Sequence, residues 1–73
     1  MKVSLITIFT ISGDYITLGQ FLKEESFISS GGQAKFYLHE HLIKLNGAAE
    51  DRRGKKLRAG DQLELAGKRY EFK

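Results

Sequence analysis

A chain of 73 residues, with 41% hydrophobic and 11% aromatic content, can build one small core, which argues against a deep catalytic cleft between lobes. The absence of cysteine excludes disulfide bonds, cysteine-based zinc sites and thiol nucleophiles, and it fits a reducing cytoplasm. The net charge of +3 is unevenly placed: residues 52–58 (RRGKKLR) hold five of the 12 basic residues and no acid, so the remainder, with nine acids, sums to −2. Such a patch attracts polyanions.

The first predicted element is a strand over residues 3–10, which are rich in β-branched and apolar side chains. This apolar stretch is too short to span a membrane and lacks the small-residue cleavage site of a signal peptide. We therefore expect a cytoplasmic protein with no membrane partner. Residues 12–14 (SGD) predict a turn, and residues 15–16 predict a short return strand.

Two short helices are predicted next. Thr17 stands before apolar residues that share one helical face, and Gln20 can complete a capping box, so the first helix runs from residue 18 to about residue 25. A loop of small residues follows. The second helix then runs from about residue 32 to residue 40, and its inward face is Ala34, Tyr37, Leu38 and His41.

Three side chains of the second predicted helix are candidates for a functional role: Phe36, His39 and His41. Phe36 falls off the inward face, and we expect it to pack beneath the N-terminal strand; stacking on a nucleobase is the alternative. His39 and His41 are two residues apart, so on a helix they point in different directions and do not form a metal pair. We expect His41 at the edge of the core, and no metal site.

The rest of the chain predicts short strands separated by turns. Residues 42–45 form a strand that ends in the tight-turn signal Asn46-Gly47, and residues 62–65 and 68–72 form two more. The order of elements predicts one α+β domain over residues 1–73. In it a two-helix hairpin packs on a small sheet of short strands that includes the N-terminal strand.

Four motifs in the chain have the order and spacing of a known family. They are LGQFLK at residues 18–23, GGQAK at 31–35, IKLNG at 43–47 and LRAGDQL at 57–63. Together they resemble the S4-like RNA-binding domain, which is named after a ribosomal protein and is attached to pseudouridine synthases and other RNA-handling proteins. The chain is particularly similar to small stand-alone bacterial S4-domain proteins of the YaaA type, in which GGxAK and RRGKKL both occur.

The resemblance implies an S4-like (αL-motif) fold with its core motif at about residues 17–65, RNA as the partner and no cofactor. The chain departs from the family pattern in one place. Gly31-Gly32 stands where many such domains carry a serine–arginine pair, which leaves Lys35 as the only basic residue on the second helix. This departure shifts the expected RNA contact onto residues 52–58, called the basic segment below.

The basic segment is expected to bind phosphates. Arginine and lysine bind phosphate oxygens by charge, and a loop punctuated by Gly54 can follow a curved RNA backbone. We expect a structured RNA, such as ribosomal or transfer RNA, to be read by its shape and phosphate spacing, with the ribosome as a candidate partner. The predicted RNA-binding residues are Arg52, Arg53, Lys55, Lys56 and Arg58 in the basic segment, with Lys35, Lys23 and Lys44 outside it.

No enzyme is predicted. Glu50-Asp51 is expected to be a solvated pair without a nucleophile beside it, and Gly31-Gly32 is not followed by the lysine and hydroxyl residue of a phosphate loop. We therefore expect no catalytic residue and no small-molecule substrate. Three alternatives stay open: a protein-interaction adaptor that uses the N-terminal strand as a free sheet edge, a DNA-binding protein, and a basic face that only solubilises the domain.

Overall fold

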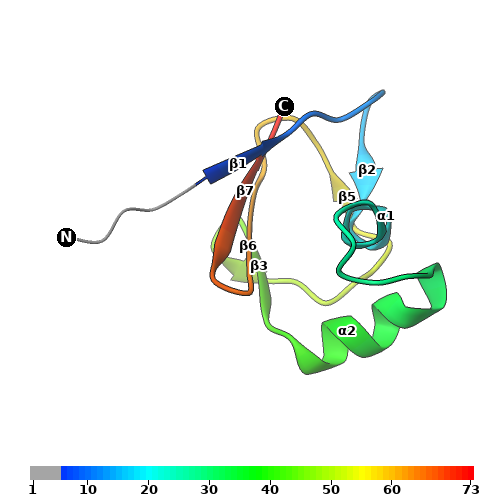
Figure 1. The fold of residues 1–73 in the computed structure, drawn as a ribbon. Coiled ribbons are helices and arrows are strands. Elements are labelled where there is room, and N and C mark those ends of the chain that lie inside the picture. Colours follow the sequence, from blue (N-terminus) through cyan, green and yellow to red (C-terminus); the bar gives the residue numbers. More distant parts are fainter. Residues whose placement is uncertain (1–5) are drawn as a thin grey trace.

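Two strands precede the helices and five strands follow them in the computed structural model, which describes residues 6–73 (Figure 1). Two short α-helices lie on one side of a sheet, as the sequence predicted, and the α+β class is confirmed. The elements are β1 (Ile6–Phe9), β2 (Ile16–Thr17), α1 (Leu18–Glu24), a 3₁₀ turn (Gly31–Gln33), α2 (Ala34–Glu40), β3 (Ile43–Leu45), β4 (Ala48–Ala49), β5 (Lys56–Leu57), β6 (Gln62–Leu65) and β7 (Lys68–Phe72).

The described strands form two sheets. The larger has the order β1-β7-β6-β3-β4, and the smaller pairs β2 with β5. Strand β1 runs parallel to β7, so the first and last strands of the described chain lie side by side, while the other pairs are antiparallel (Figure 1). A two-residue turn joins β3 to β4, because Asn46 and Gly47 both adopt the positive φ angles, 51° and 86°, that such a turn requires.

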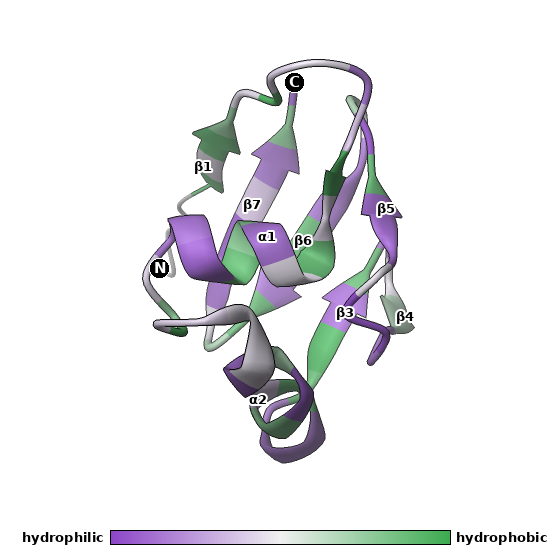
Figure 2. Ribbon diagram, turned by 90° about the vertical axis from the view of Figure 1, so that its right-hand side faces the viewer, coloured by the Kyte–Doolittle hydropathy of each residue, from purple (hydrophilic) through white to green (hydrophobic). Residues whose placement is uncertain are grey.

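Alternation along the strands separates the two faces of the larger sheet, and Figure 2 shows it as alternating hydropathy. The face toward the helices buries Ile43, Leu45, Leu63, Leu65, Tyr70 and Phe72. The opposite face, called the outer face below, carries polar residues such as Lys44, Glu64 and Arg69, which are neighbours across β3, β6 and β7.

Helix α1 is fixed at its start by a cap and along its inner side by aromatic packing. Thr17 and Gln20 form the predicted capping box. The fully buried ring of Phe21 makes edge-to-face contacts with Phe9, Tyr70 and Phe72, at centroid distances of 5.1, 4.9 and 5.2 Å. These contacts hold the helix on β1 and β7.

The structure corrects two side-chain expectations for the second helix. Phe36 does not pack beneath β1 but is 68% exposed, because β1 and α2 lie at opposite ends of the molecule (Figures 1 and 2). His41 is not on an inward helical face, since α2 ends at Glu40 and His41 has extended backbone. Its exposed ring instead stacks on Tyr37, with a centroid distance of 4.3 Å.

Some predicted boundaries also differ. The predicted strand over residues 3–10 corresponds to β1 in its described part, and residues 3–5 lie outside the described residues. The predicted strand at residues 42–45 begins one residue later, and Leu42 is 67% exposed. Strands β4 and β5, two residues each, were not predicted. Within residues 6–73, neither helix is long and apolar enough to cross a bilayer.

The packing of Phe21 generates a stability prediction. Phe21→Ala removes a fully buried ring and should lower the free energy of unfolding by about 3–5 kcal/mol, measured by urea denaturation. Phe36→Ala is the matched control, because its ring is exposed, and its effect should stay within about 0.5 kcal/mol. Equal losses in the two variants would contradict the assignment of Phe21 to the core and Phe36 to the surface.

Candidate nucleic-acid interface

The backbone of the basic segment is attached to the first turn of α1. The first N–H groups of a helix have no partner inside the helix and need acceptors from elsewhere. Here the N–H of Leu18 donates to the carbonyl of Lys55, and the N–H of Gly19 donates to the carbonyl of Arg53, both at 2.8 Å. The two hydrogen bonds satisfy the helix start and fix the path of the basic segment.

Gly19 allows this close approach. A Cβ atom at Gly19 would lie 3.3 Å from the carbonyl oxygen of Arg53, tighter than most van der Waals contacts. It would also lie 3.6 Å from Cβ of Arg53 and 3.8 Å from Cβ of Ala34, the first residue of α2. Three parts of the chain therefore meet at one point: the basic segment, the start of α1 and the start of α2.

Two residues of the basic segment, Lys56 and Leu57, form strand β5, and this corrects in part the expectation of a loop. In β5, Lys56 pairs with Thr17 and Leu57 pairs with Ile16 of β2. Leu57 is fully buried while Lys56 is exposed, as alternation along a strand requires. The buried leucine anchors the segment, and the lysine beside it stays available to a ligand.

Tyr15 contacts Lys56 and lies beside the exposed side of α1. The ammonium of Lys56 lies 4.9 Å from the centroid of the Tyr15 ring, within the range of a cation–π contact. Tyr15 also lines a surface groove together with Gln20 and Lys23. Tyr15 thus lies near two of the predicted residues: Lys56 contacts its ring, and Lys23 lines the same groove.

Arg52 is held by Glu50, and this corrects the expectation that Glu50 is solvated. Only 10% of the Glu50 side chain is exposed. Nε of Arg52 donates to Oε2 of Glu50 at 2.9 Å, and a terminal guanidinium nitrogen of Arg52 donates to Oε1 at 3.2 Å. These hydrogen bonds lower the pKa of the Glu50 carboxyl and raise that of the Arg52 guanidinium. Arg52 therefore presents less free charge than Arg53.

Two further predicted residues are Arg58 and Lys35. Arg58 follows β5, and its backbone N–H donates to the carboxylate of Asp61 at 2.9 Å, which leaves its exposed side chain at a turn. Lys35 is exposed and directly follows Ala34, the α2 residue closest to Gly19. It therefore stands next to the meeting point of the two helices and Arg53.

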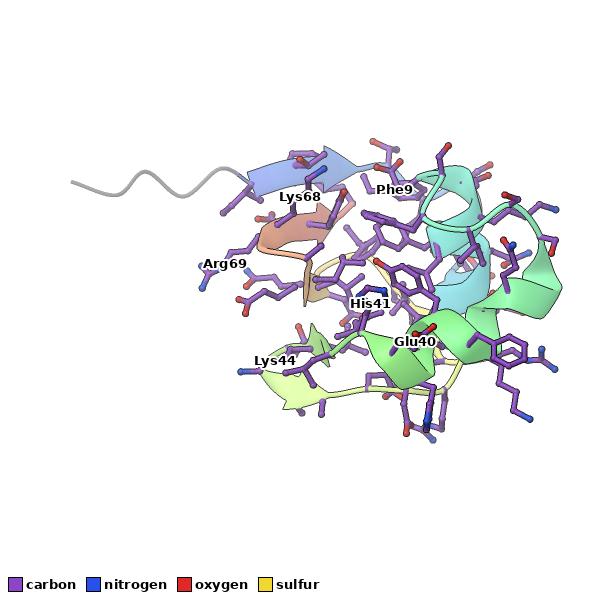
Figure 3. The ribbon with its side chains drawn as sticks, turned by 60° about the horizontal axis from the view of Figure 1, so that its bottom comes forward. Phe9, Glu40, His41, Lys44, Lys68 and Arg69 are labelled. Carbon is purple, nitrogen blue, oxygen red and sulfur yellow. The ribbon has the colours of Figure 1, made fainter. Side chains whose placement is uncertain are left out.

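Lys44 is separated from the other predicted residues. It is exposed in the middle of β3, between the buried residues Ile43 and Leu45, and so it lies on the outer face. Figure 3 shows Lys44 and Arg69 pointing away from the helices. The cross-strand neighbour of Lys44 on β6 is Glu64, whose carboxylate accepts a hydrogen bond from Arg69 at 3.1 Å. The outer face thus mixes both signs of charge.

Three features of the interface were missed in the sequence: Gly19, Tyr15 and the Glu50–Arg52 pair. Tyr15 had a usable signal, because an aromatic residue shortly before a capped helix often faces solvent at a turn. Gly19 and Glu50 had none, since their roles depend on segments more than thirty residues apart or on the shape of one turn. Within residues 6–73, no three His, Cys, Asp or Glu side chains gather as a metal site requires.

Comparisons with known proteins cover the whole of this region. The family described as "S4 domain" matches residues 9–73. A Bacillus subtilis (strain 168) protein named "Probable ribosome maturation protein RlbA" is 48% identical over 58 residues, which cover 80% of this chain and 82% of the relative. An Escherichia coli (strain K12) protein named "Putative RNA-binding protein YbcJ" is 38% identical over 53 residues, which cover 73% and 76% of the two chains.

The Glu50–Arg52 pair generates a pH prediction. The folded state lowers the pKa of Glu50, so the pair stabilises the fold above the ordinary value of 4.5, and this contribution is lost as the pH falls through the lower folded value. Glu50→Gln should therefore melt below the parent near pH 7, and the difference should shrink as the pH falls below 4.5. Arg52→Ala should behave alike, since it removes the two side-chain hydrogen bonds and the opposite charge of the pair. A melting difference that is independent of pH would contradict the pair.

Proposed function

The chain belongs to the S4 domain family, and on that premise we propose that it is a non-catalytic module that docks structured RNA through the basic segment and the adjoining helices. The family and the printed name of the Escherichia coli relative support RNA as the partner. The name of the Bacillus subtilis relative supports the ribosome, or RNA on its way into a ribosome, as the target. The cytoplasm is the proposed place of action.

One observation carries this proposal: the cations of the basic segment are attached to a fixed backbone. Two hydrogen bonds to α1 and the pairing of β5 with β2 hold the backbone of Arg53, Lys55 and Lys56 in place. A preorganised segment loses less conformational entropy on binding than a free loop would. It also presents its charges at a set spacing, which suits the regular phosphates of a folded RNA.

The distribution of charge favours recognition of the RNA by its shape rather than by its base sequence. Paired RNA hides its base edges in a deep, narrow groove, so a small basic surface contacts its phosphates and sugar hydroxyls. Arg53, Lys55 and Lys56 form the centre of the proposed contact, with Lys23 on the Tyr15 side and Lys35 on the α2 side. Arg52 and Arg58 contribute less in this proposal, because Glu50 holds one and the other follows β5 at a turn.

A second candidate function is protein docking along β1, which is the terminal strand of the larger sheet in the described part of the chain. Ile6 and Ile8 are 49% and 50% exposed there, on the outer face. A peptide strand could add to such an edge. Ile6→Lys should abolish binding of such a protein partner and leave RNA binding unchanged, which separates this candidate from the first.

The proposed RNA contact generates a comparison of two double variants. Arg53→Gln/Lys56→Gln removes two charges from the basic segment, and Lys44→Gln/Arg69→Gln removes two from the outer face. The first should weaken binding to a hairpin RNA about tenfold, at about 0.7 kcal/mol per exposed cation. It should also reduce the slope of log K against log salt by about 1.4–1.8. Fluorescence anisotropy over a salt series measures both quantities.

The outer-face variant is the control, because it has the same net charge and should bind as the parent does. Equal losses in the two variants would mean that only net charge matters and would contradict the proposed surface. A duplex DNA of equal length, added as a competitor, decides the remaining alternative. If the DNA displaces the RNA at equal concentration, the module does not select RNA.

A further inference from the structure

The ring of Phe36 is the most exposed of the large apolar side chains in residues 6–73, at 68%. Helix α2 fixes its direction. Ala34 and Leu38 bury the inner side of the helix, and Phe36, two residues from each, therefore points about 160–200° away from that side. The ring is held in the solvent by a packed helix rather than by a free terminus.

The surroundings of Phe36 are polar and include phosphate-binding groups. Lys35 precedes it, and His39 and Glu40 share its side of α2 at offsets of three and four residues. Ala34, two residues before it, meets Arg53 at the position of Gly19. Around the helix, Lys35 lies between Ala34 and Phe36, about 100° from each. The ring therefore lies next to Lys35, at the edge of the surface that Lys35 and Arg53 would offer to an RNA strand.

A single ring among polar neighbours is a poor protein-docking site, because such sites need a contiguous apolar patch. An aromatic ring next to cations is instead the combination that binds nucleic acid strands, in which bases stack and phosphates are neutralised. Stacking by one side chain also needs a base with a free face. Bases inside a continuous helix are covered by their neighbours, so the free face must come from a loop, a bulge or a helix end.

We propose that Phe36 is a base-stacking residue and that the bound RNA presents an unpaired nucleobase beside the phosphates held by the basic segment. The inference rests on the proposed function and narrows it to a stem that carries an unpaired base. Recognition then has two parts. The cations bind the phosphates of the stem, and the Phe36 ring stacks only where an unpaired base interrupts the stem. A perfectly paired duplex would satisfy only the first part.

Variants at Phe36 separate stacking from apolar contact. Phe36→Leu keeps an apolar side chain but has no aromatic face, whereas Phe36→Trp keeps the aromatic face. Against a stem closed by an unpaired loop, Phe36→Leu should weaken binding about 5- to 150-fold, the range for losing one stacked base, and Phe36→Trp should bind at least as well as the parent. Against a perfectly paired duplex several times longer than the stem, in which nearly every base face is covered, all three proteins should bind almost equally. Thermal melting of each variant confirms that the fold is unchanged.

Tryptophan fluorescence gives a direct readout, because the chain contains no tryptophan and Phe36→Trp supplies the only indole. The looped hairpin should quench this fluorescence, and the same hairpin with abasic sites in its loop should not. Unchanged hairpin affinity in Phe36→Leu, or equal quenching by the abasic hairpin, would overturn the inference. The proposed function would still stand if Arg53→Gln/Lys56→Gln weakened binding, and it would fall with the inference if that variant bound as the parent does.

Discussion

The candidate interface depends on the N–H groups at the start of α1, which have no acceptor within the helix itself. Any helix start needs acceptors, and here the carbonyls of Arg53 and Lys55 supply two of them. A strongly basic segment is thereby placed across a helix terminus by its backbone, so none of its cationic side chains is needed for the attachment. The bare Cα of Gly19 permits the approach, and buried Leu57 closes the segment onto β2. In Arg53 and Lys55, the backbone carbonyl makes the attachment to α1 and the side chain carries the charge.

The same packing places the cationic side chains of the chain on two different sides of the larger sheet. Phe21 and its aromatic partners hold α1 on one side of the larger sheet, so the helices and the basic segment share that side. Lys44, in the middle of a strand between buried residues, is directed to the outer face, where its cross-strand neighbour is Glu64, the partner of Arg69. Glu50 further reduces the free charge of Arg52. A count of basic residues therefore overstates the proposed RNA-binding surface, whose centre in this proposal is Arg53, Lys55 and Lys56.

Local signals in the sequence predicted local structure well. Thr17 and Gln20 predicted a helix start, Asn46-Gly47 predicted a tight turn, and both are confirmed because neighbouring residues decide them. The α+β class and the family followed from the order of such signals. Strands β4 and β5 were missed, since two-residue ladders depend on what lies opposite. Phe36 was misplaced for the same reason: helical periodicity gives the side of α2 on which a residue lies but not what covers that side.

The central claim is that the basic segment and the outer side of α2 form one RNA surface, distinct from the outer face of the sheet. Backbone amide chemical shifts, followed by NMR while a looped hairpin RNA is added to the labelled protein, test it most directly. The account predicts the largest shift changes at residues 52–56 and at the start of α2 through Phe36, with little change at Lys44, Glu64 and Arg69. Shift changes centred on those three outer-face residues, with residues 52–56 unaffected, would contradict it.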